Sequence, residues 1–350
     1  MNKWLIVGLI IIFIVIISII YYFFFQSGQS SFTQSTTTIT NTGSTSGGII
    51  QLYVADAYTA EAQDFANNFA KSTGIQVAIK SAGSLTLARQ IAQGSPVSVF
   101  MPVAIDAVRP SFLGNRSPGW AIAIGADQLV LAYSNLTLQN QNAKVALSYA
   151  NKSDWYNFFL KITDGSLKIG IADPTQDPAG FRGWLVLQLA GYVYANGDLK
   201  YFVDRIIANK GNISAAHAAD LVAPLVAGNI QFLFIYRSAA IAKGLYYVQL
   251  PPQINLGDPN YTTIYQKASL NISGTIIRGA PIYLYITIPK DPVNPDAAVQ
   301  FLIFVIKNNN ILSKYGITPL KPAYLYNSTQ VPKYLLDLIS QNYLIIKGSL

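Results

Sequence analysis

The sequence contains no cysteine and only one histidine, His217, among its 350 residues. Without cysteine the chain forms no disulfide bond, thiolate-ligated zinc site, iron–sulfur cluster or thiol nucleophile. A single histidine excludes metal sites that need two or more imidazole ligands. Charged residues make up only 11% of the chain. Because disulfides are absent, apolar burial has to stabilise the fold by itself.

The sequence also lacks the short motifs of common hydrolases and nucleotide-binding enzymes. It has no Gly-x-Ser-x-Gly nucleophile elbow and no Gly-x4-Gly-Lys-Ser/Thr phosphate loop, and its one histidine lies in an alanine-rich segment. The net charge is +8, but the 24 lysines and arginines are scattered rather than clustered, which argues against nucleic-acid binding. We therefore predict a protein that is not an enzyme and binds no nucleic acid.

Long apolar runs are rare as well, and only one is long enough to span a membrane. Residues 4–25 carry no charge, and 22 residues at about 1.5 Å each match a hydrocarbon core of about 30 Å. The run ends in aromatic residues, which are typical of a membrane interface. We predict a transmembrane anchor over residues 1–25, with the N-terminus in the cytoplasm because Lys3 precedes the run. A cleaved signal peptide and a buried core helix are the alternatives.

Residues 26–48 are mostly Ser, Thr, Gly, Gln and Asn, without any charged residue. Such a segment buries too little apolar surface to fold, so we predict a disordered tether, and its Ser/Thr density also suits O-glycosylation. Seven Asn-x-Ser/Thr sequons follow, which begin at Asn115, Asn135, Asn151, Asn212, Asn260, Asn271 and Asn327. Together these features predict a single-pass glycoprotein of the cell membrane with its body on the extracellular side.

From residue 49 onward, strand-sized apolar runs alternate with amphipathic segments of helical spacing. We expect strands at residues 49–54, 75–79, 121–133, 230–236 and 283–288, and helices at residues 60–71, 85–93, 180–195 and 297–307. Alternation at this spacing predicts an α/β fold with mostly parallel strands.

Three loops lead directly into helices and carry polar residues at the helix starts. Ser84 and Asp177 are expected N-caps, and Asp177 is followed by Pro178, a residue favoured in the first helical turn. His217 precedes a third helix start, and Asp56 is expected to cap the helix that begins near residue 60. Free N–H groups and the helix dipole make these ends suitable for an anion, although capping alone explains each loop.

Several longer segments carry a more specific signal. They include Ser81-Ala82-Gly83-Ser84, Asp177-Pro178-Ala179-Gly180-Phe181-Arg182, Phe234-Ile235-Tyr236-Arg237-Ser238 and Leu250-Pro251-Pro252-Gln253-Ile254-Asn255-Leu256. With these segments in this order along the sequence, the chain resembles the archaeal molybdate/tungstate-binding proteins of ABC importers over roughly residues 49–307. The resemblance implies a two-lobed type 2 periplasmic-binding fold with the ligand cleft between the lobes. Residues 49–130 plus 279–350 then form the first lobe, and residues 131–278 form the second.

The same resemblance implies a function. A protein of this family captures an oxyanion, tungstate or molybdate, in its cleft and delivers it to an ABC permease and its ATPase. We accordingly expect an extracellular binding protein that is a monomer and needs no cofactor.

Five ligand positions follow from the resemblance, namely Ala57, Ser84, Asp177, Ala218 and Tyr236. Ser84 and Tyr236 match residues that donate hydrogen bonds to the oxyanion. Asp177 matches a carboxylate that approaches the Mo or W atom itself, so no site for a free metal cation is implied. The family's first serine and its glutamate fall on Ala57 and Ala218, which offer only backbone N–H groups. These two alanines leave an alternative open, in which the same fold binds another oxyanion or a small neutral solute.

Charged neighbours of these positions each have two interpretations. Arg182 and Arg237 either face the cleft or pair with Asp173 and Asp220, and we expect the pairing. His217 either donates to the ligand or is a solvated histidine near a helix start, and we expect the solvated histidine.

Overall fold

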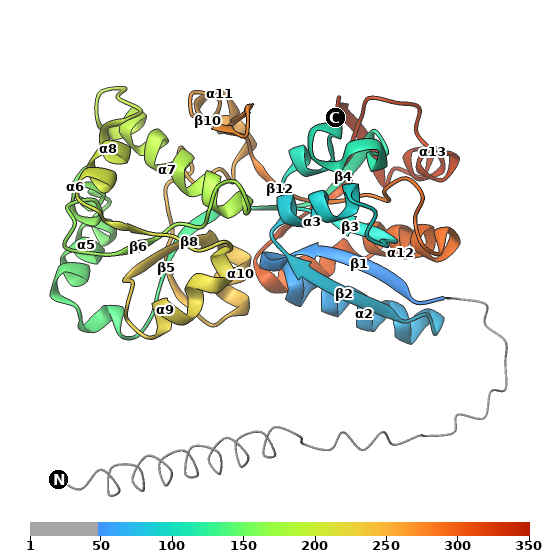
Figure 1. The fold of residues 1–350 in the computed structure, drawn as a ribbon, viewed down its shortest axis with the longest axis horizontal. Coiled ribbons are helices and arrows are strands. Elements are labelled where there is room, and N and C mark those ends of the chain that lie inside the picture. Colours follow the sequence, from blue (N-terminus) through green and yellow to red (C-terminus); the bar gives the residue numbers. More distant parts are fainter. Residues whose placement is uncertain (1–47) are drawn as a thin grey trace, which may run out of the picture. The chain divides into compact units, whose positions relative to one another are not determined.

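A computed structural model describes residues 48–350 of the chain. The predicted anchor at residues 1–25 and the predicted tether at residues 26–48, apart from Gly48, lie outside the described residues. Within residues 48–350, no helix is both long and apolar enough to cross a membrane. These residues belong to one compact unit, in which two groups of sheets and helices lie side by side (Figure 1). We call the two groups the first and the second lobe.

The first lobe contains a three-stranded parallel sheet in the order β2-β1-β3. Its strands are β1 (Ile50–Ala55), β2 (Val77–Ala82) and β3 (Val99–Met101), and the helices between and after them are α2 (Thr59–Thr73), α3 (Ser84–Ala92) and α4 (Pro110–Leu113). Phe65 and Phe69 lie one turn apart on the buried face of α2. Because β1 and β2 are parallel, the residues that follow them, Asp56 and Gly83, emerge at the same edge of the sheet.

The second sheet of the first lobe has the order β12-β4-β13-β14. Its strands are β4 (Trp120–Asp127), β12 (Ile282–Ile286), β13 (Thr318–Asn327) and β14 (Leu344–Gly348), accompanied by α12 (Pro295–Lys307), the 3-10 helix η7 (Asn309–Tyr315) and α13 (Lys333–Ser340). The expectation of mostly parallel strands is wrong here, since both β12 and β13 pair antiparallel with β4. β4 carries the chain out of this lobe and β12 brings it back, so these two neighbours run in opposite directions.

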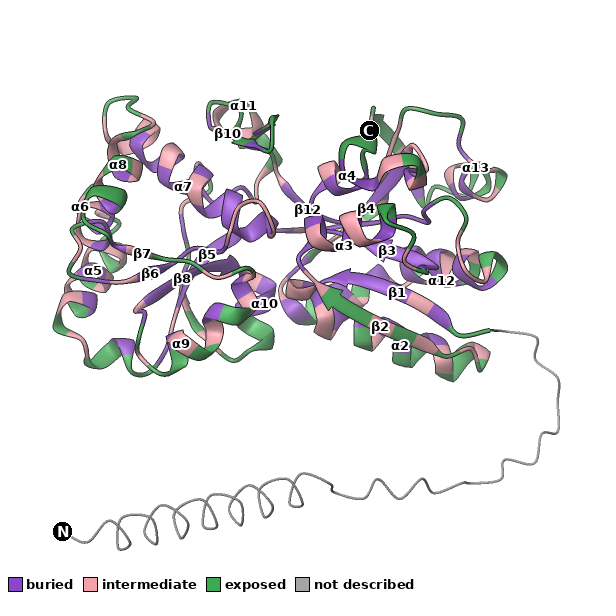
Figure 2. Cartoon of the chain, in the orientation of Figure 1, coloured by how far each residue is buried: buried purple, intermediate pink, exposed green. Residues whose placement is uncertain are grey.

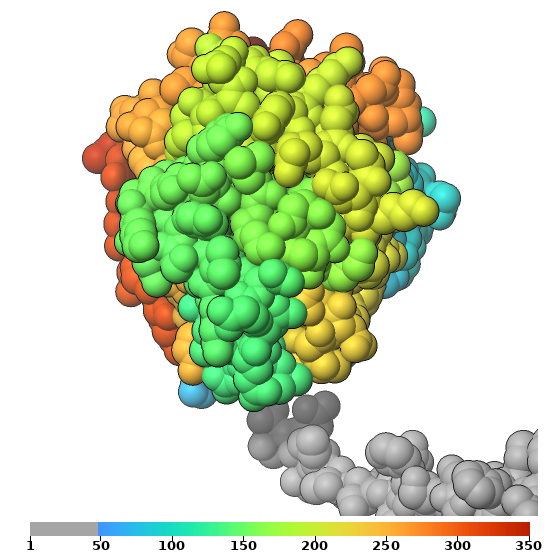
Figure 3. Space-filling model, turned by 90° about the vertical axis from the view of Figure 1, so that its left-hand side faces the viewer, coloured from blue at the N-terminus to red at the C-terminus, as the bar shows by residue number. Residues whose placement is uncertain are grey.

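The second lobe is built on a five-stranded sheet in the order β7-β6-β8-β5-β9. Its strands are β5 (Leu129–Tyr133), β6 (Ile169–Gly170), β7 (Asn212–Ile213), β8 (Phe232–Tyr236) and β9 (Tyr246–Val248). Its helices are α5 (Gln141–Asn151), α6 (Trp155–Ile162), α7 (Pro178–Tyr194), α8 (Tyr201–Ala208), η5 (Ala218–Leu221), α9 (Val222–Val226) and α10 (Arg237–Ala242). β8 has a strand on either side, and all five of its residues are buried (Figure 2). The segments of α5, α6 and α8, green to yellow-green, cover the outer face of this lobe (Figure 3).

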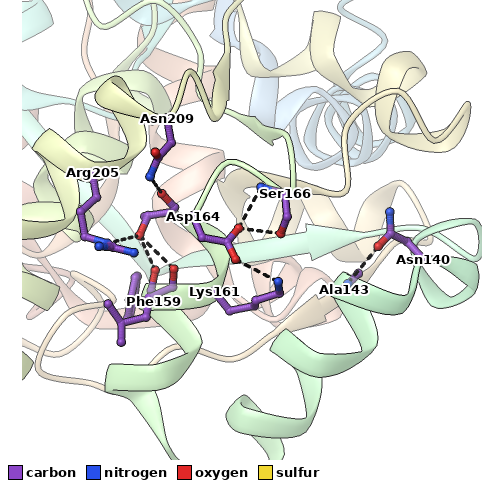
Figure 4. Close-up of polar contacts among 10 residues, drawn as sticks. Asn140, Ala143, Phe159, Lys161, Asp164, Ser166, Arg205 and Asn209 are labelled. Carbon is purple, nitrogen blue, oxygen red and sulfur yellow. Dashed lines mark hydrogen bonds and ion pairs between the residues drawn. The ribbon is translucent and has the colours of Figure 1, made fainter.

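Side-chain hydrogen bonds tie α6 to α8 at the outer end of the second lobe (Figure 4). The Nδ2 of Asn209 donates to the carbonyl of Thr163 at 2.8 Å, and the Nε of Arg205 lies 3.4 Å from the Thr163 hydroxyl. The Asp164 carboxylate accepts from Lys161 Nζ at 2.9 Å in the same turn. These bonds satisfy polar groups where α6 ends, so the helix pair keeps its relative position.

The chain passes between the lobes at two places. The first is the single residue Gln128 between β4 and β5. The return path after β9 runs through η6 (Pro259–Tyr261), α11 (Thr262–Tyr265) and the hairpin of β10 (Ser269–Ile272) with β11 (Thr275–Arg278), and it ends at β12. Two crossings of this kind form a hinge, because only a few backbone torsions have to change for one lobe to rotate against the other.

Asp127, the last residue of β4, joins both lobes at this hinge. It is 2% exposed, and its Oδ2 accepts hydrogen bonds from Tyr58 Oη of the first lobe at 3.1 Å and from Ser238 Oγ of the second lobe at 2.5 Å. Burial raises the pKa of Asp127, while these hydroxyl donors and the N–H of Gln128 lower it. The carboxyl group is therefore the shared acceptor of a buried network at the hinge.

Glu61 on α2 should make the stability of the fold depend on pH. It is fully buried, and neither carboxylate oxygen has a hydrogen-bond partner among residues 48–350. Burial raises the pKa of Glu61 from 4.5 to about 8. Between these pKa values the folded state keeps a proton that the unfolded state has released, so the free energy of unfolding falls by about 5 kcal/mol as the pH rises.

Glu61→Gln removes this titration and should be more stable than the parent at pH 8.5, with little difference near pH 4.5. Urea denaturation of both chains at the two pH values measures the effect. Asp154→Asn, which changes the side chain that caps α6, is the control and should leave the pH dependence of the free energy of unfolding close to that of the parent. Equal pH dependence of the parent and of Glu61→Gln contradicts the assignment.

Candidate functional site

Four of the five predicted ligand positions line one small cavity between the lobes. Ala57 belongs to the 3-10 helix η1 (Asp56–Tyr58) of the first lobe, whereas Asp177, Ala218 and Tyr236 belong to the second. The cavity measures about 10 Å³ and is lined in addition by Asp56, Ala179, Ala219, Ile235, Ala239 and Lys243. Its size corresponds to about one water molecule. The lobes are therefore closed on each other at the place where the sequence predicts the ligand.

Ser84, the fifth predicted position, does not line this cavity. The expected N-cap role of Ser84 is wrong, because Gly83 occupies the N-cap and Ser84 is the first residue of α3. Its side chain is fully buried, and its Oγ accepts a hydrogen bond from the N–H of Val103 at 3.1 Å. The hydroxyl thus holds the loop after β3, and a ligand role for Ser84 stays a prediction.

Carboxylates of the protein already occupy the backbone donors that we expected to meet an anion. The N–H of Ala57 donates to Asp56 Oδ1 at 2.8 Å. Asp177, which is the N-cap of α7 as predicted, accepts from the N–H of Ala179 and from the N–H of Ala218, each at 2.8 Å. Asp56 does not cap α2, whose N-cap is Tyr58. An oxyanion has to take the place of these carboxylate oxygens to reach the two alanine N–H groups.

The two carboxylates make the cavity strongly acidic. Burial and, second, the nearby charge of Asp177 raise the pKa of Asp56 to about 8. Burial also raises the pKa of Asp177, although two backbone N–H groups lower it. Among the ion pairs of residues 48–350, none involves either aspartate. From the sequence we expected Asp56 only to cap a helix, and the chain pattern gave no sign that it approaches Asp177 across the cleft.

Arg182 is a residue whose role the sequence did not indicate. Its Nη1 donates to Tyr236 Oη at 2.6 Å, and its Nη2 donates to the carbonyl of Val103 in the first lobe at 2.7 Å. The expected pairing with Asp173 or Asp220 is therefore wrong. Tyr58 from the first lobe stacks on Tyr236 with ring centroids 5.8 Å apart. The pocket tyrosine is thus held by one contact from each lobe.

Arg237 also differs from expectation. Its Nη2 donates to the carbonyl of Gly316 in the first lobe rather than to an aspartate. Arg182 and Arg237 therefore both cross between the lobes, at the start of α7 and at the start of α10. No local pattern distinguishes such arginines from surface arginines, because their acceptors are backbone carbonyls far away in the sequence.

The lobes approach each other closely at Gly83. A Cβ added to Gly83 would lie 2.6 Å from the carbonyl oxygen of Gln176 and 2.7 Å from His217 Nδ1. Beside this point, Thr86 Oγ1 donates to Gln176 Oε1 at 2.9 Å. His217 lies at the start of η5 and is partly exposed, as expected, but its Nδ1 is shielded from solvent beside Gly83 of the first lobe. Only glycine permits this approach of the two backbones.

One family model and two relatives match most of this sequence. The model of the bacterial extracellular solute-binding proteins matches residues 50–318. An uncharacterized solute-binding protein of Sulfurisphaera tokodaii is 40% identical over 319 residues, which cover 87% of this chain and 84% of that protein. The molybdate/tungstate-binding protein WtpA of Pyrococcus abyssi is 27% identical over 264 residues, which cover 69% of this chain and 74% of that protein.

A solved structure shares the fold as well. The periplasmic molybdate-binding protein of Azotobacter vinelandii has a TM-score of 0.54 and 20% sequence identity, and the match covers 77% of this chain and 98% of that one. The mixed α/β fold is therefore that of the periplasmic binding proteins. The relatives are solute-binding proteins rather than enzymes, and the family resemblance inferred from the sequence is confirmed. The chain thus belongs to the family of bacterial extracellular solute-binding proteins.

Proposed function

We propose that this protein captures an oxyanion, tungstate or molybdate, between its lobes and delivers it to an ABC permease and the ATPase of that permease. The observation that carries the proposal is the convergence of Ala57, Asp177, Ala218 and Tyr236 on one cavity between the lobes. The similarity to a molybdate/tungstate-binding protein supports the choice of anion. Attachment to the membrane through residues 1–25, an extracellular body and a monomeric state complete the proposal.

The two alanine N–H groups suggest how an anion closes the lobes. Ala57 offers its donor from the first lobe and Ala218 from the second, each now bonded to a neighbouring carboxylate. An anion that replaces these carboxylate oxygens binds both lobes at once. The closed arrangement then gains the binding free energy, and the closed lobes present the surface that docks on the permease.

Calorimetric titration of the full chain with tungstate, molybdate and sulfate tests the proposal. The chain is kept in mild detergent because of its apolar N-terminal run. We expect heat of binding with tungstate and with molybdate. If none of the three anions gives heat of binding, the proposal is contradicted.

Tyr236→Phe provides a sharper test of the site. The variant keeps the ring that stacks on Tyr58 but removes the hydroxyl, so tungstate affinity should fall about tenfold or more. Tyr156→Phe is a matched control, because Tyr156 is exposed on α6 and the hydrogen bond of its hydroxyl within residues 48–350 is to Tyr201, far from the cavity. Equal losses in both variants contradict a role for the Tyr236 hydroxyl.

A different cargo is the second candidate, and the absence of side-chain donors at Ala57 and Ala218 favours it. Ala218→Glu should then create or tighten tungstate binding by restoring the carboxylate of the resembling family. If the parent already binds tungstate tightly and the substitution changes nothing, this second candidate is excluded.

A further inference from the structure

We propose that Asp56, Asp177 and His217 form a binding site for a divalent transition-metal cation of the Zn2+ type. Each residue offers one ligand atom, and the three atoms lie within 4.8 Å of one another. Asp56 comes from the first lobe, and the other two come from the second lobe, at the starts of α7 and η5. A cation bound here therefore joins the lobes directly. The inference goes beyond the proposed function and does not require that an oxyanion binds.

Two atoms of this cluster are buried without any partner. Asp56 Oδ2 and His217 Nδ1 are shielded from solvent, and neither has a hydrogen-bond partner among residues 48–350. A buried polar atom without a partner is unfavourable, because it has lost its hydrogen bonds to water and gained none in return. Both atoms belong to residues of the cluster, and a cation would satisfy them, since a carboxylate oxygen offers a lone pair and so does Nδ1 when the imidazole carries its proton on Nε2. This observation is independent of the acidic character of the cluster.

The charges and the donor types select the class of cation. Metal ligation requires deprotonated ligands, and in that form two carboxylates and one imidazole together carry a charge of −2, which a divalent cation neutralises. Lys243 also lines the cavity, but it is exposed and forms no ion pair with either aspartate within the described residues. Calcium and magnesium take about six or more oxygen ligands, whereas Zn2+ accepts a mixed set of four nitrogen and oxygen ligands.

The size of the site suits one metal ion. Zn2+ binds histidine nitrogen and carboxylate oxygen at about 2.0–2.2 Å, which sets tetrahedral ligand atoms about 3.4 Å apart. The three ligand atoms lie within 4.8 Å of one another and have to approach to that distance when the ion binds. The cavity of about 10 Å³ is lined by Asp56 and Asp177 but not by His217, so it lies beside the cluster, and a tetrahedral oxyanion has to displace the carboxylates to enter it. Three protein ligands leave a fourth coordination position for water or for an oxygen atom of a solute.

Zinc titration of the full chain, after treatment with a chelator and desalting, tests this inference in the absence of oxyanion. We expect one Zn2+ per chain. His217→Gln and Asp56→Asn should each weaken binding at least tenfold, because each removes one of three ligands. Asp164→Asn is the matched control, since Asp164 is a carboxylate at the outer end of the second lobe (Figure 4) and should leave the affinity unchanged.

The results separate the metal site from the proposed oxyanion function. No zinc binding, or zinc binding that neither His217→Gln nor Asp56→Asn weakens, overturns the inference. Thermal unfolding of each variant shows whether a loss comes from misfolding, and His217→Gln serves as the second variant should Asp56→Asn fail to fold. Tungstate binding in the presence of chelator, without zinc binding, supports the proposed function alone. Zinc binding without tungstate binding supports the metal site alone.

Discussion

Asp127→Ala is expected to lower the free energy of unfolding by about 2–4 kcal/mol. The substitution removes the acceptor shared by Tyr58 Oη and Ser238 Oγ at the hinge, and it leaves both hydroxyls buried. It also frees the N–H of Gln128, which donates to Asp127 Oδ1 at 2.7 Å. The substitution also removes the desolvation penalty of a buried carboxylate, but this gain offsets only part of the loss in stability. Urea denaturation followed by tryptophan fluorescence measures the change.

Two further variants define what the Asp127 carboxylate does. Asp127→Asn keeps one oxygen acceptor and should lose clearly less stability than Asp127→Ala. Asp106→Ala removes a carboxylate that pairs with Arg109 at 2.9 Å near the surface, and it should cost less than about 1 kcal/mol. A loss for Asp127→Ala no larger than that for Asp106→Ala contradicts the role of Asp127 as the link between the lobes.

Gly83→Ala should lower the affinity for tungstate, the proposed solute, about tenfold to hundredfold while leaving the fold nearly as stable. The added methyl group would stand 2.6 Å from the Gln176 carbonyl and 2.7 Å from His217 Nδ1, so the closed lobes have to separate. Overpacking of this kind destabilises a structure by about 1–3 kcal/mol, and here it destabilises only the closed arrangement of the lobes. The φ of −58° at Gly83 suits alanine, so the first lobe itself is not strained.

Titration calorimetry with tungstate, together with hydrogen exchange of the backbone around residues 83–86 and 176, measures the effect of Gly83→Ala. Exchange there should become faster in the variant because the lobes separate more often. Gly348→Ala is the control, since an added Cβ there has its nearest neighbour, Tyr326 Cδ1, at 3.9 Å. Unchanged affinity and exchange in Gly83→Ala contradict the close contact between the lobes.

Much of the secondary structure was predictable because apolar periodicity acts locally. The expected strands and helices are present with their ends shifted by a few residues, and the expected helix at 180–195 is α7 (Pro178–Tyr194). The stretch 121–133 forms two strands, β4 and β5, which belong to different sheets. β13 escaped prediction because Pro319 and Pro322 interrupt its pattern, and its pairing with β4 shifts register between Pro319 and Tyr324. α5 escaped because its first turn depends on a side-chain cap, Asn140, more than on a large apolar face.

The site was predictable only where a position lies within a recognisable segment. Asp177 and Tyr236 were placed in this way, and both line the cavity. The approach of Asp56 to Asp177, and the contact of Arg182 with Val103, join residues that are distant in the sequence. Such contacts depend on how two lobes meet, which a periodic pattern within one element does not encode.

Because the lobes meet closely at Gly83 and enclose a cavity of only about 10 Å³, we expect the opening of the lobes to limit the rate at which a solute binds. A polyatomic solute cannot enter the cavity until the lobes open. At high solute concentration the observed rate of binding therefore reaches a plateau, which equals the rate at which the lobes open. Dissociation of the solute requires the same opening of the lobes. Its residence time therefore depends on the motion of the lobes as well as on the strength of its contacts with the protein.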